Sequence, residues 1–149
     1  MVKDASVTEA HEHQRTGAVY VDVRSRREFA AGHPSGAVNV PLMDYDEDTG
    51  QPSPNGDFVR VIRANFAPDA RLLIGCQVGG RSQRAAQMLE ASGFTDITNV
   101  RGGFGGFRDR MSGRLIDAGW EESGLPVETG EPDHASYAAL ARKADDSDR

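Results

Sequence analysis

Short apolar runs alternate with helical segments along most of this chain, and that alternation restricts the possible folds more than any other feature. The run AVYVDV at 18–23 is a continuous β-prone stretch, typical of a strand that is buried on both faces. Shorter runs of the same kind follow at 37–41, 71–75 and 96–100. Strands that alternate with helices predict an α/β fold, with a mostly parallel central sheet and helices on both of its faces.

Capping signals place helices between these strands. The segments SVTE at 6–9 and SRRE at 25–28 have capping-box spacing, with a hydroxyl at the cap and a carboxylate at the third residue after it. Gly17 and Gly32 can end the helices that begin there. Further helices are expected where apolar residues share one helical face, at 58–66 and 81–92.

The 149 residues suit one domain, in which the pattern distinguishes successive parts. Residues 1–17 hold the N-terminal helix, and 18–110 form the core that carries the chemistry. Within that core, 43–56 has the composition of a long polar loop. Residues 111–149 are expected to be an extension that packs on the core and ends in a frayed helix and a disordered tail.

Charge and composition exclude several classes of function. A net charge of −6 argues against nucleic-acid binding, and no apolar stretch approaches the length of about 20 residues that spans a bilayer. The N-terminus lacks the apolar core of a signal peptide, so a cytoplasmic location without a membrane partner is expected. One cysteine excludes an internal disulfide, and the histidines form no metal-ligand pattern with it. We therefore expect neither a metal nor a cofactor.

The single cysteine, Cys76, stands in GCQVGGRS, between the strand at 71–75 and the following helix. In an open α/β sheet, reactive groups lie beyond the carboxyl ends of the strands. Gly79 and Gly80 allow successive amides to turn inward, and the helix start adds partial positive charge. Such a loop would hold the sulfur as a thiolate and bind an oxyanion beside it. A buried structural cysteine is the simpler alternative, but the loop chemistry favours a nucleophile.

The candidate site follows from this interpretation. Cys76 is the catalytic nucleophile, and the substrate-binding residues are those of the loop and the helix start: Gln77, Val78, Gly79, Gly80, Arg81 and Ser82. Arg81 would either bind donor oxygens or brace the loop against a carboxylate. For Ser82, capping of the helix is favoured over donation to the loop.

Residues outside the loop are expected to support the site. Asp22 and Arg24 lie at the end of a strand on the same side of the sheet as Cys76, and a structural ion pair is favoured over a catalytic role for them. Glu28 is most simply the capping-box acid. The glycines at 102–106 favour a tight passage of the chain near the site over phosphate binding, because no helix with a Walker-type lysine follows them.

The loop CQVGGRS resembles the active-site loop of rhodanese-type sulfurtransferases. Three further stretches agree with that family in the same order: VDVRSRREFAAGH, GHPSGAVNVPL and VRGGFGGFRD. The resemblance covers roughly 18–110 and omits the C-terminal extension. The sequence departs from the family at Pro34, where an aliphatic residue is usual, and at Phe107, where tryptophan is common. Gln77 stands where many members carry arginine or lysine, which removes a positive charge beside the sulfur.

The resemblance implies a two-step transfer of sulfane sulfur. The Cys76 thiolate attacks the outer sulfur of a donor such as thiosulfate, sulfite leaves, and a persulfide remains on Cys76. The loop amides would hold the charge of the terminal sulfur. A thiophilic acceptor, either cyanide or a thiol, then removes it, and a protein could serve as the acceptor.

Two other functions stay open from the sequence. A cysteine-dependent phosphatase uses the same thiolate, amide nest and arginine, but its signature has five residues between cysteine and arginine, whereas only 77–80 separate them here. A persulfide carrier without turnover, or a thiol redox or interaction module, would share the chemistry of Cys76 up to the persulfide. An intramolecular redox switch is disfavoured because the chain has no second cysteine.

Overall fold

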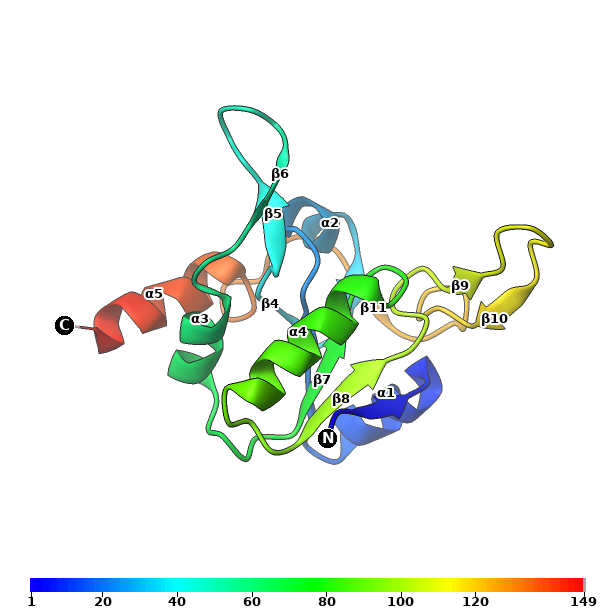
Figure 1. Cartoon of the computed structure of the whole chain (residues 1–149), viewed down its shortest axis with the longest axis horizontal. Coiled ribbons are helices and arrows are strands. Elements are labelled where there is room, and N and C mark those ends of the chain that lie inside the picture. The colour runs from blue at the N-terminus through cyan, green and yellow to red at the C-terminus, as the bar shows by residue number, and fades with distance from the viewer. Residues whose placement is uncertain (149) are drawn as a thin grey trace.

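A five-stranded sheet forms the centre of the molecule in the computed structural model, which describes residues 1–148 (Figure 1). Every neighbouring pair of strands in it is parallel, which confirms the α/β prediction. In spatial order the strands are β1 (Lys3–Ala5), β8 (Ile97–Val100), β7 (Leu72–Gly75), β2 (Val19–Asp22) and β4 (Val38–Asn39).

Helices cover both faces of this sheet. Successive residues of a strand point to opposite faces, so each face presents apolar side chains that a helix can cover. Val21 and Ile74 face one layer of the core, and Tyr20 and Leu73 face the other. The first layer is covered by α3 (Phe58–Asn65), α4 (Gly80–Ala91) and α5 (Tyr137–Ser147). The second is covered by α1 (Val7–Arg15) and α2 (Arg26–Ala31). No helix within residues 1–148 is long and apolar enough to cross a membrane.

Both expected capping boxes are present. The Ser6 hydroxyl accepts a hydrogen bond from the Glu9 amide at the start of α1, and the Glu9 carboxylate accepts one from the Ser6 amide. The reciprocal pair between Ser25 and Glu28 starts α2. These short helices therefore begin where the local sequence specifies.

Two short elements differ from the sequence-based expectation. The chain forms an edge strand, β1, ahead of the N-terminal helix, and it pairs with β8. The polar segment expected to be a loop contains an antiparallel hairpin of β5 (Met43–Tyr45) and β6 (Pro52–Pro54). Strands of this length carry too few residues to show a period, so only the pairing partner identifies them.

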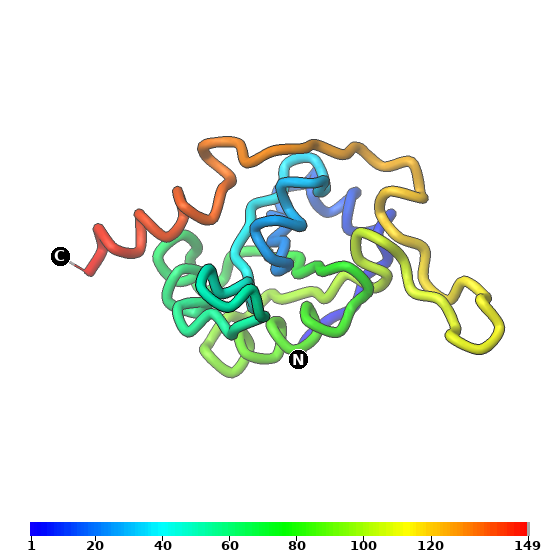
Figure 2. Tube along the Cα trace, turned by 90° about the horizontal axis from the view of Figure 1, so that it is seen from above, coloured from blue at the N-terminus to red at the C-terminus, as the bar shows by residue number. Residues whose placement is uncertain are grey.

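The C-terminal extension passes along the molecule from one end to the other, shown from yellow to red in Figure 2. It contributes β11 (Val127–Glu128), which pairs antiparallel with β3 (His33–Pro34). The extension ends in α5, where a frayed helix was expected. This helix is capped by Ser136 and hydrogen-bonded to α3 through the Asn65 side chain and the Leu140 carbonyl, 3.0 Å apart. Packing against α3, which no local signal reveals, stabilises this helix. Arg149 lies outside the described residues.

A further hairpin, of β9 (Phe107–Arg108) and β10 (Leu115–Asp117), projects from the body of the molecule in both views (Figures 1 and 2). Its two ends meet at Gly106 and Gly119, where a Cβ on Gly119 would overlap the Gly106 backbone. Residues 107–118 are therefore a self-contained excursion that leaves the core and returns to the same point.

Candidate active site

Cys76 directly follows β7 at the carboxyl edge of the sheet, and only 2% of it is exposed. The strand passes directly over Tyr20 before it reaches the cysteine, and a Cβ on Gly75 would overlap the Tyr20 hydroxyl. Burial raises the pKa of Tyr20 well above its ordinary value, so this phenol keeps its proton beneath the loop. Glycine is thus required at position 75, because a side chain there would collide with Tyr20 directly before the cysteine.

Two groups contact the sulfur. The Gly79 amide donates a hydrogen bond to Sγ at 3.1 Å, and the Ser82 Oγ lies 3.3 Å away. Gly79 has a φ of +135° and precedes the first residue of α4, Gly80. The sulfur therefore lies at the N-terminal end of α4, where an amide and the helix dipole both favour negative charge.

Ser82 does not cap α4, contrary to the expectation from sequence, since no side chain caps this helix. It is fully buried, and its Oγ lies 2.7 Å from the Asn99 Oδ1 on β8. A hydroxyl carries one proton, so Ser82 donates to one acceptor at a time and can turn from Asn99 to the sulfur. Asn99 was not among the predicted site residues. The sequence shows only that a polar residue lies within a predicted strand, and the structure adds that all four residues of that strand are buried.

A buried ion pair supports the loop from below. Arg24 and Asp22 are 3% and 1% exposed, and their closest charged atoms, Nη2 and Oδ2, are 2.7 Å apart. Arg24 Nη1 also donates to the Gln77 Oε1 at 3.0 Å, and its guanidinium lies 4.5 Å from the centre of the Phe104 ring. An arginine or lysine at position 77 could not accept this hydrogen bond. The departure at Gln77 therefore links the loop to the ion pair.

Arg81 is held by a carboxylate in this structure. Its guanidinium donates to both oxygens of Glu28, at 2.7 and 3.0 Å, while Glu28 also caps α2. Partial burial alone would raise the pKa of Glu28, but hydrogen bonds from Arg81 and from the Ser25 amide outweigh it and lower that pKa to about 2. The pair braces the start of α4 against the start of α2.

The glycine-rich segment passes tightly over the loop. The amides of Phe104 and Gly105 donate to the carbonyls of Cys76 and Gln77, each at 2.8 Å. A Cβ on Gly103 would overlap the Cys76 carbonyl oxygen. The segment thus closes the cysteine loop through its backbone, and side chains larger than hydrogen would separate the two.

The structure accounts for the departure at Phe107. Phe107 is 42% exposed on β9 and does not replace a core tryptophan. The tryptophan that packs beside the glycines is Trp120, which is fully buried and donates its amide to the Gly103 carbonyl at 2.9 Å. The excursion at 107–118 separates it from the glycines in sequence, so adjacency could not be read from the chain.

A hollow of about 250 Å³ adjoins the cysteine loop. Gly80 and Arg81 contribute one side of it, and Arg84, which is exposed on the next turn of α4, contributes another. Leu42 and Met43 complete the lining. Glu28 holds the guanidinium of Arg81, whereas Arg84 makes no ion pair within residues 1–148, so the hollow offers a cation to a small oxyanion.

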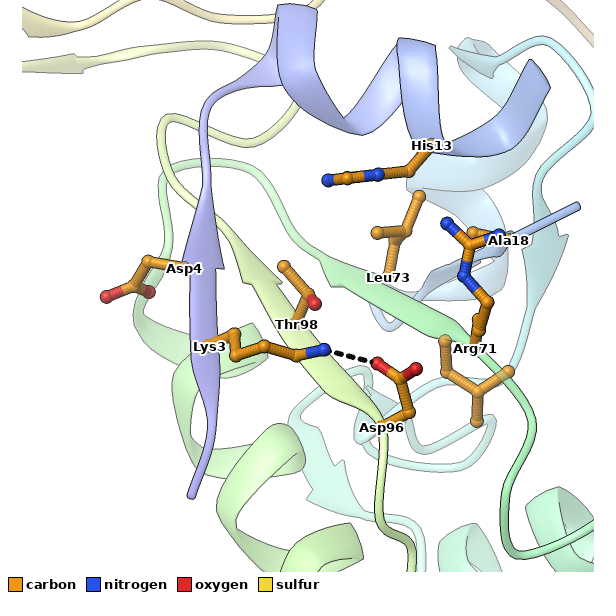
Figure 3. Close-up of a pocket in the computed structure, with 9 residues that line it drawn as sticks. Lys3, Asp4, His13, Ala18, Arg71, Leu73, Asp96 and Thr98 are labelled. Carbon is orange, nitrogen blue, oxygen red and sulfur yellow. Dashed lines mark hydrogen bonds and ion pairs between the residues drawn. The ribbon is translucent and has the colours of Figure 1, made fainter. Parts of the chain in front are cut away.

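A second hollow, of about 170 Å³, lies at the amino ends of the same strands (Figure 3). Lys3 and Asp96 point toward one another there, with 2.6 Å between Nζ and Oδ1, and His13 extends over the hollow from α1. Its lining offers no thiol. Within residues 1–148, no group of histidine, cysteine and acidic side chains could hold a metal ion.

Comparison with known proteins places these features in a family. The family model for the rhodanese-like domain matches residues 6–110. Thiosulfate sulfurtransferase 16 of Arabidopsis thaliana is 35% identical, and the match covers 82% of this chain and 89% of that protein. Senescence-associated protein DIN1 of Raphanus sativus is 36% identical over 80% of this chain, which spans 57% of that protein's length.

A solved structure agrees with these sequence matches. The crystal structure of Rv0390 from M. tuberculosis has a TM-score of 0.70 and 29% identity, covering 87% of this chain and 98% of that one. The fold match extends beyond residue 110, where the family model ends, because 87% of this chain is more residues than precede that point.

Proposed function

The chain belongs to the rhodanese-like domain family, and from that membership we propose that it is a sulfurtransferase, which moves a sulfane sulfur from a donor such as thiosulfate to a thiophilic acceptor through a persulfide on Cys76. One observation carries the proposal: the only thiol of the chain accepts a hydrogen bond from the Gly79 amide at the N-terminal end of α4. That position stabilises a sulfur anion before and after the transfer.

In the first step, the sulfonate oxygens of the donor occupy the hollow lined by Arg81 and Arg84. The Cys76 thiolate attacks the outer sulfur, the sulfur–sulfur bond of thiosulfate breaks, and sulfite leaves with the electron pair. The terminal sulfur of the new persulfide carries the negative charge, close to the Gly79 amide and the start of α4.

In the second step, the acceptor attacks the terminal sulfur and Cys76 leaves as a thiolate. The Ser82 hydroxyl, 3.3 Å from Sγ, can turn its proton toward the sulfur as the charge returns. The ion pair of Asp22 and Arg24 stays outside the chemistry, because each carboxylate oxygen is engaged by the guanidinium. Both are positioning residues that hold the loop through Gln77.

A phosphatase is disfavoured by the same contacts. The loop holds one residue fewer than the phosphatase signature, and Asp22 cannot donate a proton to a leaving group while Arg24 binds both of its oxygens. A persulfide carrier would use the identical first step, so it is separated only by measuring turnover.

Intact mass spectrometry tests the proposal. The protein is stripped with cyanide, treated with thiosulfate and compared with Cys76→Ser. We expect one added sulfur on the native protein alone, removed again by cyanide as thiocyanate. A gain from a persulfide donor but not from thiosulfate would support a carrier loaded by another protein. No gain from either donor would refute the sulfur chemistry.

A second measurement tests the donor hollow. Arg84→Gln should raise the KM for thiosulfate by about tenfold, because it removes the guanidinium at the hollow that no carboxylate holds within residues 1–148. Arg142→Gln, an exposed arginine on α5, is the matched control and should leave the KM unchanged. Equal KM values in the two variants would place the donor elsewhere.

A further inference from the structure

The hairpin of β9 and β10 exposes an apolar surface that the core does not use. Phe107, Met111, Leu115 and Ile116 are 42%, 98%, 41% and 54% exposed. Cross-strand partners share a face, so the pairing of Phe107 with Asp117 and of Leu115 with Arg108 places Phe107 and Leu115 on opposite faces of the hairpin. The hairpin therefore offers exposed apolar side chains to another molecule on both of its faces. An isolated two-stranded hairpin is only marginally stable in water. Because these side chains are exposed, they bury little apolar surface that would stabilise it.

Charge on the hairpin has the opposite sign to that of the whole chain. Arg108 pairs with Glu122, and the Asp109 carboxylate accepts the amides of Met111 and Ser112 within the turn. Within residues 1–148, Arg110 and Arg114 make no ion pair. A protein with a net charge of −6 thus presents two free guanidinium groups beside exposed apolar side chains.

The base of the hairpin is joined to the cysteine loop. Gly105, which bonds to the Gln77 carbonyl, is adjacent to Gly106, where the excursion begins. Val78, in the loop itself, is 48% exposed, whereas the sulfur of Cys76 is buried. The hairpin leaves the body of the molecule next to the turn between β7 and α4, so a macromolecule bound to it would lie close to the cysteine loop (Figure 1).

We propose that the hairpin 107–118 is the docking site for a protein sulfur acceptor, whose reactive cysteine lies in a segment with acidic and apolar side chains. The inference rests on the proposed sulfurtransferase function. Acidic residues would pair with Arg110 and Arg114, and apolar residues would cover Phe107 and Ile116. The acceptor thiolate attacks the terminal sulfur of the Cys76 persulfide, the bond to the cysteine sulfur breaks, and Cys76 leaves as a thiolate while the acceptor becomes the persulfide.

Paired synthetic peptides test this docking site. One carries a cysteine between leucine and phenylalanine with glutamates on both sides, and the other has lysines in place of the glutamates. Sulfur transfer from the loaded protein is followed by mass spectrometry. The acidic peptide should accept sulfur at least about tenfold faster, the effect expected of steering by complementary charge. Equal rates would overturn the proposal.

Three variants locate the effect. Joining Gly106 directly to Gly119 removes the hairpin where its ends already touch, and the double variant Arg110→Glu with Arg114→Glu reverses its charge without shortening the chain. Both should abolish the preference for the acidic peptide and leave turnover with cyanide within about twofold. Met88→Ser, which removes an exposed apolar side chain from α4, is the control and should keep the preference. A preference that survives both hairpin variants would refute docking there.

A measurement of peptide binding distinguishes the docking site from the sulfur chemistry of Cys76 on which the proposal rests. The acidic peptide with serine in place of cysteine should bind by fluorescence anisotropy to the native protein and not to the charge-reversed variant. Binding by a protein that gains no sulfur from either donor would sustain the docking site and refute the transferase. Transfer to cyanide without any peptide binding would do the reverse. Hairpin-dependent binding to phosphatidylserine vesicles, or a hairpin-dependent dimer in sedimentation, without binding to the acidic peptide would overturn the assignment of the partner.

Discussion

The strands of the central sheet have an ion pair at their carboxyl ends, here called the carboxyl edge, and another at their amino ends, the amino edge, in different surroundings. At the carboxyl edge, Asp22 and Arg24 are 1% and 3% exposed and tie the strands to the cysteine loop. At the amino edge, Lys3 and Asp96 are 60% and 34% exposed and border an open hollow. A buried ion pair therefore helps to hold the strands and the loop in place. An exposed pair contributes little to stability, because water competes for its charges.

The direction of the strands explains why the candidate active site lies at one edge. In a parallel sheet, each strand leads at its carboxyl end into a helix N-terminus, where amides are free and the dipole is positive. The Cys76 sulfur meets the Gly79 amide at such a point. At the opposite edge α1 presents its last turn, which includes His13, over the hollow. The presence of a hollow alone therefore does not identify the active site.

The largest expected effect would break the buried pair. Asp22→Asn leaves the Arg24 guanidinium buried without a countercharge, which should lower the free energy of unfolding by about 3–5 kcal/mol. Urea unfolding followed by circular dichroism measures the loss, with Asp96→Asn as the matched variant at the exposed edge. A loss no larger for Asp22→Asn than for Asp96→Asn would contradict the contrast between the edges.

The next effect concerns backbone contact at the carboxyl edge. Gly103 has a φ of +55°, and a Cβ there would overlap the Cys76 carbonyl, so Gly103→Ala should cost about 1–3 kcal/mol and slow sulfur transfer. Gly17, at the amino edge, has a φ of +108° and open space around it, so Gly17→Ala carries backbone strain alone. Thermal unfolding and transfer rates compare the two. Normal transfer by a folded Gly103→Ala would show that the close passage is dispensable.

A smaller effect depends on pH. The pKa of Glu28 in the folded protein is about 2, below the ordinary 4.5, so its contribution to stability is complete above pH 4.5 and is lost as the pH falls toward 2. Glu28→Gln should therefore flatten this part of the acid-unfolding curve and loosen Arg81. Glu9→Gln changes the matching capping acid of α1, which accepts no hydrogen bond from an arginine side chain within residues 1–148, and should flatten the curve less. Identical curves for the two variants would show that the Arg81 pair adds nothing.

The smallest effect lies at the amino edge. Lys3→Met removes an exposed ion pair with Asp96, and the free energy of unfolding should change by no more than about 0.5 kcal/mol. Sulfur transfer should be unchanged, because the hollow in Figure 3 lies at the other end of the strands. A loss of transfer in the folded variant would mean that the two edges are coupled.

The sequence by itself determined what depends on neighbouring residues. The order of strands and helices follows from apolar runs and capping boxes, because a buried strand or a helix cap is specified within a few residues. The position of Cys76 between β7 and α4 follows for the same reason. These features include the fold class and the place of the candidate nucleophile in the fold.

Only the tertiary structure decided which distant residues meet. Gln77 meets Arg24, Arg81 meets Glu28, and Ser82 meets Asn99 across gaps in the chain that no local pattern bridges. The same holds for β1, for α5, and for Trp120, which reaches the glycine segment only after the excursion at 107–118. Short strands, packed helices and bracing ion pairs gain their stability from partners far away in sequence, so their partners had to be seen in place.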